Sequence, residues 1–141
     1  DAKGVQTPTE TLTRGSGSCR DMATLMLEAL RTVGLPTRFA SGYLHCAASE
    51  AGTASTHAWA EAYLPEIGWS GYDPTLGESV SVNHVVTGVS NHPRGVMPIS
   101  GTFFDTPSSY LGMTVAVKTE RLSEPEPPLN PHDTGPEAVG R

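Results

Sequence analysis

The sequence contains few charged residues, few aromatic residues and little cysteine. Charged residues make up 17% of the 141 residues and aromatic residues 6%. The two cysteines, Cys19 and Cys46, are too few for a disulfide framework, and no C-x-x-C pair indicates a structural zinc site. The sequence leaves open whether one bridge joins them. The 15 glycines and 12 prolines are typical of a loop-rich globular domain and not of a coiled coil.

Positive charge and long apolar runs are also missing. The net charge is −6 and the isoelectric point about 5.2, so no partner of the nucleic-acid or anionic-membrane type is expected. No run approaches the roughly 18 apolar residues of a membrane span. No secretory leader opens the chain, and a start at Asp1 is expected of a processed or excised piece. Two cysteines without a framework favour a reducing compartment, which predicts a cytoplasmic location.

The chain is predicted to hold one domain over residues 1–122 and a tail over residues 123–141. Five of the 12 prolines fall in the tail, which has too few apolar side chains to offset its ordering entropy. The first eight residues are a weaker case of the same kind. One helix followed by short antiparallel strands predicts an α+β fold. The helix is expected at 19–33, and the strands at 38–45, 57–64, 69–73 and 113–119, with two shorter ones near 83–88 and 95–104.

The predicted helix over 19–33 has the clearest pattern in the sequence. Ser18 is a candidate N-cap, and Asp21 lies in the first turn, where a negative charge suits the helix dipole. Apolar residues recur at steps of three and four, which predicts a broad and mostly buried face. The members of this stripe are Met22, Met26, Ala29 and Val33, widened by Ala23, Leu27 and Leu30.

Cys19 lies at the start of this helix, after the small residues of RGSGS. A thiol in the first turn feels the positive end of the helix dipole, and its own unpaired N–H can stabilise an oxyanion. Both effects favour a reactive thiolate. The alternative is that Cys19 is a small buried apolar residue, which is the more common role of a lone cysteine.

His57 and Asp73 lie on two strands that a turn at 65–68 joins. Pairing about the turn places His57 opposite position 76 or so, with Asp73 one diagonal step away. A carboxylate there would orient the imidazole and stabilise its charged form. Taken separately, a half-buried structural histidine and an Asp-Pro turn are the simpler interpretations. The shared geometry favours one Cys-His-Asp constellation.

Three blocks occur in order, GSGSCRD, LPTRFASGYL and THAWAEAYLPEIGWSGYDPT. Together they resemble the bacterial transglutaminase-like superfamily, which is related in design to papain-like cysteine enzymes. The resemblance runs from about residue 11 to residue 104, and NHVVTGVSNHPRGVMPISGTFF is similar to the segment after the aspartate block in that family. The resemblance implies a papain-like core with Cys19 as nucleophile, His57 as general base and acid, and Asp73 as the orienting carboxylate.

Two departures from the family pattern affect what is expected. Family members usually carry a further region, often rich in β-structure, before the cysteine helix, and only 18 residues precede Cys19 here. A second oxyanion donor or part of the substrate cleft is therefore expected to be absent, either from this chain or from the protein. Some members have lost the triad and act as scaffolds, whereas this sequence keeps all three residues.

Other candidate residues carry weaker signals. Trp59 and Tyr63 share the predicted face of His57 and would wall a substrate groove, although such aromatics are more often core residues. Arg20, beside the nucleophile, is a candidate substrate contact. A metal cluster of His45, Cys46 and His84 with His57 matches no zinc spacing, and no calcium loop is present, so no metal or other cofactor is expected.

The sequence therefore predicts a cysteine-nucleophile enzyme that transfers acyl groups through a thioester. Its substrate would be a peptide or protein with a glutamine-like carboxamide or an amide bond, and hydrolysis is favoured over transamidation. One alternative is a non-catalytic peptide- or protein-binding module on the same scaffold, and another is an inactive piece of a larger enzyme. Edge strands of a small sheet make a homodimer one expected arrangement.

Overall fold

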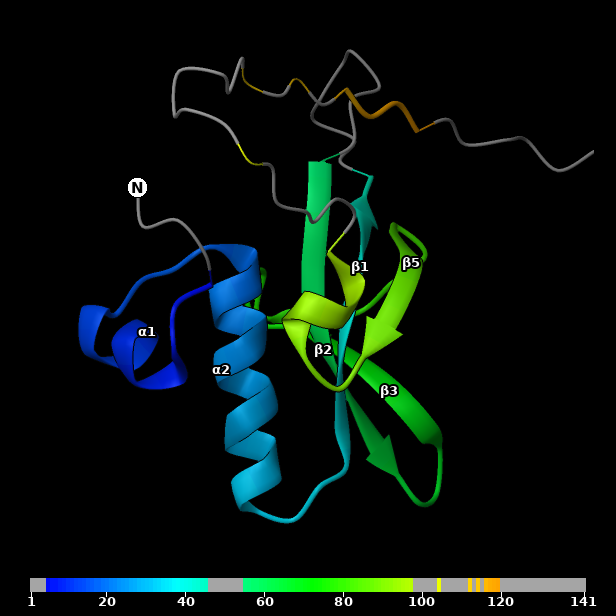
Figure 1. Cartoon of the computed structure of the whole chain (residues 1–141). Helices are drawn as coiled ribbons and strands as arrows, with labels where there is room; N and C mark the ends of the chain where they lie inside the picture. Colours follow the sequence, from blue (N-terminus) through cyan, green and yellow to red (C-terminus); the bar gives the residue numbers. More distant parts are fainter. Residues whose placement is uncertain are drawn as a thin grey trace, which may run out of the picture.

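A computed structural model describes residues 5–45, 55–97, 104, 112, 114 and 116–119. In these residues, helices lie against one face of a five-stranded antiparallel sheet, which confirms the predicted α+β class. The strand order is β4-β3-β2-β1-β5, so β2 lies at the centre (Figure 1). The elements in chain order are α1 (Pro8–Arg14), α2 (Cys19–Thr32), β1 (Thr37–Leu44), β2 (Ser55–Leu64), β3 (Gly68–Asp73), β4 (Glu78–Ser79), β5 (His84–Ser90) and the 3-10 helix η1 (Pro93–Val96).

Helix α1 was not expected, and the prediction of poor order is wrong for residues 5–8. Thr7 caps α1 by a capping box with Glu10, and Pro8 begins the helix, where its missing N–H costs nothing. Gly15 ends α1 with φ of 64°, a left-handed conformation that glycine adopts without a Cβ penalty. The Thr-Pro-x-Glu signal was therefore present in the sequence. It turns the chain back so that α1 lies beside α2 (Figure 1).

Helix α2 has nearly the predicted bounds but buries less of its surface than predicted. Ala23 and Leu27 are fully buried, whereas Ala29 is exposed and Val33 is 72% exposed. The sheet covers only one side of the helix, so the stripe that included Ala29 and Val33 was placed on the wrong face. The buried core consists of Ala23, Leu27, Phe39, Ala58 and Ala60, with Cys19, Met26 and Val96 partly buried against it.

Strands β1, β2 and β3 lie within two residues of the bounds predicted for them. The strand predicted near 83–88 corresponds to β5, whereas the one predicted to begin near residue 95 is wrong in its described part, where η1 lies. Pro93 opens η1 and removes a donor that a sheet ladder would need. The predicted strand 113–119 is wrong in its described residues, 114 and 116–119, of which Lys118 forms a single bridge and the others no strand. The tail 123–141 and Cys46 lie outside the described residues.

Candidate active site

The site lies where β2 extends beyond the end of its neighbour β3. Ala60 pairs with Tyr72, so the register brings the last residue of β3, Asp73, level with Trp59. Within the described part of the chain, no strand pairs with the edge of β2 beyond that point. The Tyr63 N–H donates to Pro36 on the β1 side, and by the alternation of a strand the Ala58 N–H points to the open edge. A backbone hydrogen bond from Ala58 to the Cys19 sulfur fills that position.

Helix α2 presents Cys19 to this edge because its first turn is held tightly. Asp21 accepts hydrogen bonds from the Ser18 N–H at 2.7 Å and the Ser18 hydroxyl at 2.8 Å, which completes a capping box. The backbone N–H of Gln6 donates to the other oxygen of Asp21 at 2.7 Å. Asp21 is 3% exposed, so it ties the segment before α1 to the helix that carries the thiol. The sequence indicated Asp21 for its charge but not this bond to Gln6.

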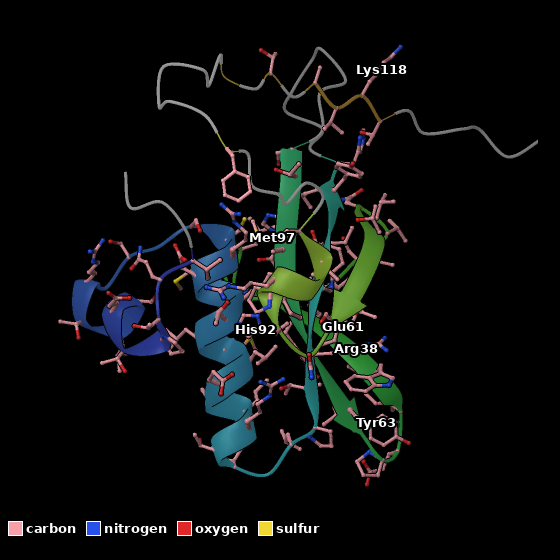
Figure 2. The ribbon with its side chains drawn as sticks, viewed as in Figure 1. Arg38, Glu61, Tyr63, His92, Met97 and Lys118 are labelled. Atoms are coloured by element: carbon pink, nitrogen blue, oxygen red, sulfur yellow. The ribbon has the colours of Figure 1, made fainter. Side chains whose placement is uncertain are left out.

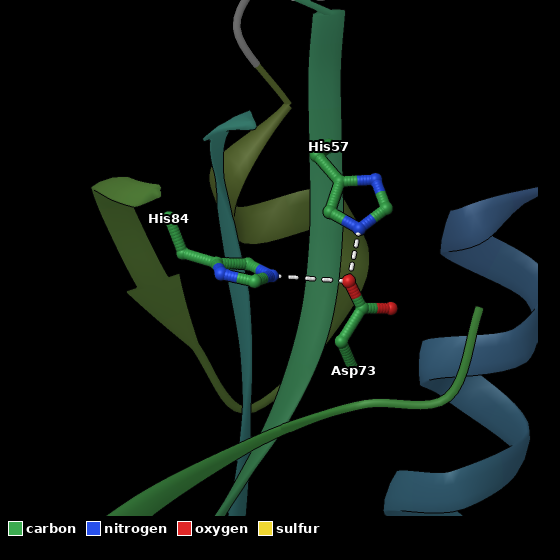
Figure 3. Close-up of side chains that lie close together, drawn as sticks. All are labelled: His57, Asp73 and His84. Atoms are coloured by element: carbon green, nitrogen blue, oxygen red, sulfur yellow. Dashed lines mark hydrogen bonds and ion pairs between the residues drawn. The ribbon is translucent and has the colours of Figure 1, made fainter. Parts of the chain in front are cut away.

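His57 and Asp73 meet across the β2–β3 hairpin, as Figure 3 shows. The His57 Nε2 and the Asp73 Oδ2 are 2.5 Å apart, and both side chains are buried. The second oxygen of Asp73 accepts the N–H groups of Thr75 at 2.9 Å and Leu76 at 3.3 Å. The predicted diagonal relation is therefore present, one residue away from the register that the sequence indicated. Because Nε2 is engaged, Nδ1 is the ring nitrogen left for the thiol.

Electrostatics favour charge on Cys19 and His57 together. The hydrogen bond with His57 lowers the pKa of the Cys19 thiol, and this outweighs the opposite effect of burial. The hydrogen bond with Cys19 and the contacts with Asp73 raise the pKa of His57 against the effect of its burial. Burial acts to raise the pKa of Asp73, but hydrogen bonds from two histidines and the charge on His57 hold it below the usual value. The arrangement can therefore hold a thiolate beside an imidazolium.

His84 is the member of the cluster that sequence reasoning missed. Its Nε2 lies 3.1 Å from the same Asp73 oxygen that His57 contacts (Figure 3). The sequence placed His84 only in a metal cluster with His45, Cys46 and His57, which matched no zinc spacing. His84 joins the cluster through the pairing of β5 with β1, in which it faces Leu44 at the end of β1. That pairing depends on a long-range register that no local pattern reports.

Three groups in this cluster have the chemistry of metal ligands. The ligand atoms of His57, Asp73 and His84 lie within 4.8 Å of one another. Both imidazoles, however, direct Nε2 at one carboxylate oxygen, at 2.5 and 3.1 Å. These are hydrogen-bond distances around an acceptor, and no room for a cation is left between the groups. The set therefore fits a hydrogen-bonded cluster and not a metal centre.

The structure brings the remaining predicted residues to different places. Trp59 is 1% exposed and lies against His57 and His84, so it packs beneath the site and does not wall an open groove. Tyr63 is 40% exposed and lies six residues along β2 from His57, about 20 Å away. Figure 2 shows Tyr63 at the far end of the sheet, so it does not wall the site either. Arg20 is exposed on the first turn of α2, and its contact with substrate stays a prediction.

An open cavity of about 360 Å³ lies over the same end of the sheet. Thr56, the residue before His57, lines it, and so does Val96, which lies with Cys19 against the edge of the core. Met97, which directly follows η1, is another lining residue (Figure 2). No lining residue carries a charge. The lining residues are Ser41, Gly42, Tyr43, Thr56, Thr87, Gly88, Gly95, Val96 and Met97.

The comparisons with known proteins concern the sequence of the chain. The sequence model of the Transglutaminase-like superfamily matches residues 1–74, which include the cysteine, histidine and aspartate blocks. An uncharacterized protein of Mycobacterium leprae is 31% identical over 105 residues, covering 72% of this chain and 37% of that protein. An uncharacterized protein of Mycobacterium tuberculosis is 30% identical over 118 residues, covering 77% of this chain and 38% of that protein.

A third relative carries a functional name. A protein-glutamine gamma-glutamyltransferase of Pseudomonas aeruginosa is 38% identical over 66 residues, covering 43% of this chain and 10% of that protein. The chain thus spans less than two fifths of the length of these relatives. No solved structure matches it. Among the described residues, no helix is both long and apolar enough to cross a membrane.

Proposed function

Because the chain belongs to the transglutaminase-like superfamily, we propose that it is a cysteine-nucleophile acyl-transfer domain that acts on carboxamide or peptide bonds. The observation that carries the proposal is the order of contacts from Cys19 through His57 to Asp73. The thiol meets one side of the imidazole, and a buried carboxylate meets the other at 2.5 Å. This is the geometry by which a nucleophile is activated and its base is oriented.

The first half of the proposed reaction forms a thioester. The Cys19 thiolate attacks the carbonyl carbon, a C–S bond forms, and the carbonyl electron pair moves onto oxygen. The backbone N–H of Cys19, at the start of α2, is placed to donate to that oxyanion. The tetrahedral intermediate collapses, the C–N bond breaks, and the imidazolium of His57 gives its proton to the departing amine.

The second half regenerates the thiolate. Neutral His57 takes a proton from water, the oxygen attacks the thioester carbon, and the C–S bond breaks to release a carboxylic acid. Hydrolysis is supported by the setting of the thiol, because residues 15–18 before Cys19 and Arg20 after it are exposed to solvent. The uncharged lining of the nearby cavity supports a neutral substrate side chain, such as a carboxamide, over a charged one.

Transamidation is the second candidate reaction. The relative from Pseudomonas aeruginosa that bears the name protein-glutamine gamma-glutamyltransferase supports it. The first half of the reaction would be identical, and a primary amine would then replace water as the attacking group. The two outcomes separate in one assay, in which a glutamine peptide is incubated with and without a fluorescent primary amine. Ammonia release without incorporation of the amine would identify hydrolysis.

The proposal is tested first at the thiol. Iodoacetamide alkylation of Cys19 is followed by peptide mass spectrometry from about pH 4 to pH 9 in the wild type and in His57→Ala. Cys46 serves as the internal reference, and an ordinary thiol has a pKa of about 8.5. We expect Cys19 to react rapidly well below that pH in the wild type and to lose this reactivity in His57→Ala.

A matched variant separates catalysis from binding. Cys19→Ser should abolish both ammonia release and amine incorporation while leaving the affinity for the glutamine peptide unchanged. If Cys19 instead titrates like Cys46 in the wild type and in His57→Ala, the proposed triad is not assembled. The binding-module alternative would then account better for the contacts among Cys19, His57 and Asp73.

A further inference from the structure

His84 has a contact that the proposed reaction does not use. Its side chain is fully buried at the start of β5, and its Nε2 lies 3.1 Å from Oδ2 of Asp73. The imidazole stands edge-on to the Trp59 ring at a centroid distance of 5.3 Å and lies 6.0 Å from the His57 ring. Figure 3 shows the two histidines approaching one carboxylate oxygen from different directions, His57 from above and His84 from the left.

The other nitrogen of His84 fixes which ring atom carries hydrogen. The backbone N–H of Ser81 donates to Nδ1 at 3.1 Å. A backbone N–H can only donate, so Nδ1 must offer its lone pair and holds no proton. The single ring hydrogen of His84 therefore lies on Nε2 and points at Asp73. In this arrangement His84 is neutral, unlike His57, whose partners favour its charged form.

The hydrogen bond from Ser81 to Nδ1 of His84 also opposes a metal ion at this cluster. A cation bound to Nε2 would require a lone pair on that atom and a hydrogen on Nδ1. The Ser81 N–H occupies the position that such a hydrogen would need. His84 is therefore a donor to the carboxylate and not a metal ligand.

Asp73 is consequently surrounded by four donors. His57 and His84 donate to Oδ2, and the N–H groups of Thr75 and Leu76 donate to Oδ1. Such a carboxylate cannot rotate about its bond to Cβ without losing bonds in a buried site. The titratable groups that face it are His57 from β2 and His84 from β5, and Cys19 on α2 faces the other side of His57.

We propose that His84 is a positioning residue, a neutral Nε2–H donor that holds the Asp73 carboxylate ionised and in the plane of the His57 imidazole. This inference rests on the proposed function, because it assigns His84 a role in the Cys19–His57–Asp73 arrangement. Among the described residues, the side chain of His84 contacts Asp73, Ser81 and the rings of Trp59 and His57, and no contact with Cys19 is found. It acts only through Asp73, on the charge and direction of the group that orients the base.

Two substitutions separate this role from simple packing. His84→Phe keeps a ring against Trp59 but removes the donor, whereas His84→Gln places an amide N–H near the position of Nε2. Loss of one donor raises the pKa of Asp73, so the carboxylate is protonated at a higher pH. In His84→Phe, the low-pH limb of Cys19 alkylation should therefore move upward by about one pH unit. At any one pH on that limb, alkylation should therefore be about 10-fold slower than in the wild type, and His84→Gln should restore most of both.

His92 provides the matched control. Its Nδ1 also accepts a backbone N–H, from Arg94 at 3.1 Å, but the residue is exposed and caps η1. His92→Phe should leave the alkylation profile of Cys19 unchanged. A measurement on the wild type needs no variant at all, because ¹⁵N chemical shifts at pH 7 report which ring nitrogen of His84 is protonated. We expect hydrogen on Nε2 alone.

The outcomes distinguish the two levels of the argument. A shifted limb in His84→Phe, with rescue in His84→Gln, supports the positioning role. If wild-type Cys19 reacts at low pH and His84→Phe matches it, the inference is overturned while the proposed function stands. A wild-type His84 protonated on Nδ1 overturns the inference even when the variants fail to fold. If wild-type Cys19 shows no reactivity at low pH, the proposed function and the inference both fail.

Discussion

Strand β2 has two ends that look alike in sequence and differ in what their charges do. At one end His57 faces Asp73 at 2.5 Å, with side chains 7% and 0% exposed. At the other end Glu61 faces Arg38 at 2.6 Å, with side chains 13% and 32% exposed. An aromatic residue follows two positions later in each case. Trp59 is buried, whereas Tyr63 meets Trp69 on the surface at a centroid distance of 5.6 Å.

Burial decides the difference between the two ends. At the more exposed end, water still reaches both charges, and a pair of this kind contributes about 1 kcal/mol to stability. At the buried end, water cannot replace a missing partner, so each proton has to be placed by a neighbouring side chain. The two ion pairs have similar N–O distances, but the pair of Arg38 and Glu61 only adds a little stability, whereas the pair of His57 and Asp73 controls protonation.

Asp73→Asn should break the buried end most completely. The amide oxygen would keep the bonds from Thr75 and Leu76, and its NH₂ group would then oppose the Nε2–H groups of both histidines. His57 is left in the wrong tautomer or orientation, and we expect turnover to fall by about 10³- to 10⁴-fold. The measurement is ammonia release from a glutamine peptide. Glu61→Gln is the control, and an equal loss in both variants would contradict the distinction between the two ends.

The two tryptophans test packing at the same two ends. Trp59→Ala should destabilise the fold by about 3 to 5 kcal/mol, because it leaves a cavity beneath His57 and His84. Trp69→Ala should cost about 1 kcal/mol, since it removes a surface stack with Tyr63 and the cation–π contact with Arg38 at 4.2 Å. Urea unfolding measures both. Similar midpoints in the two variants would show that burial does not separate these aromatics.

The pH dependence of stability should carry the signature of the buried pair. The pKa of Asp73 is lowered from 3.8, so its contribution is present above that value and is lost as the pH falls through the folded value. The pKa of His57 is raised from 6.5, so its contribution is present below that value and is lost as the pH rises through the folded value. The contribution of the pair should therefore be largest at about pH 5 to 6.

Urea midpoints of the wild type and Asp73→Asn, measured across this range, test the expectation. The difference between them should be greatest in the middle of the range and shrink on both sides. Trp69→Ala removes no ionisable group, so its difference from the wild type should not vary with pH. A constant difference for Asp73→Asn would mean that the two groups are not coupled in the folded protein.

The smallest effect is expected at the exposed ion pair. Arg38→Met should change stability by less than about 1 kcal/mol, and part of the change should vanish at high salt. A double-mutant cycle with Glu61→Gln isolates the pairwise contribution from the stacking of Arg38 on Trp69. A coupling energy of several kcal/mol would place this pair in the same class as His57 and Asp73.

Much of the fold was readable because its signals are local. The capping residue Ser18 and the alternation of β2 follow from side-chain chemistry within a few residues, and both lie where predicted. The proximity of Asp73 to His57 was predicted from the pairing of two strands about one short turn. The burial of α2 was misjudged, because an amphipathic pattern does not report how much of a helix its neighbours cover. Helix α1 was missed although its capping box is a local signal.

The sequence by itself determined the order of the chemistry, with a thiol at a helix start and an imidazole and a carboxylate on adjoining strands. It did so because helix caps and hairpin registers depend on short stretches of chain. Only the tertiary structure decided that His84, from the far edge of the sheet, joins Asp73, and that Trp59 supports the site while Tyr63 remains at the surface. Those outcomes depend on pairing β1 with β5 and on which face α2 covers, and both are fixed by packing across the whole domain.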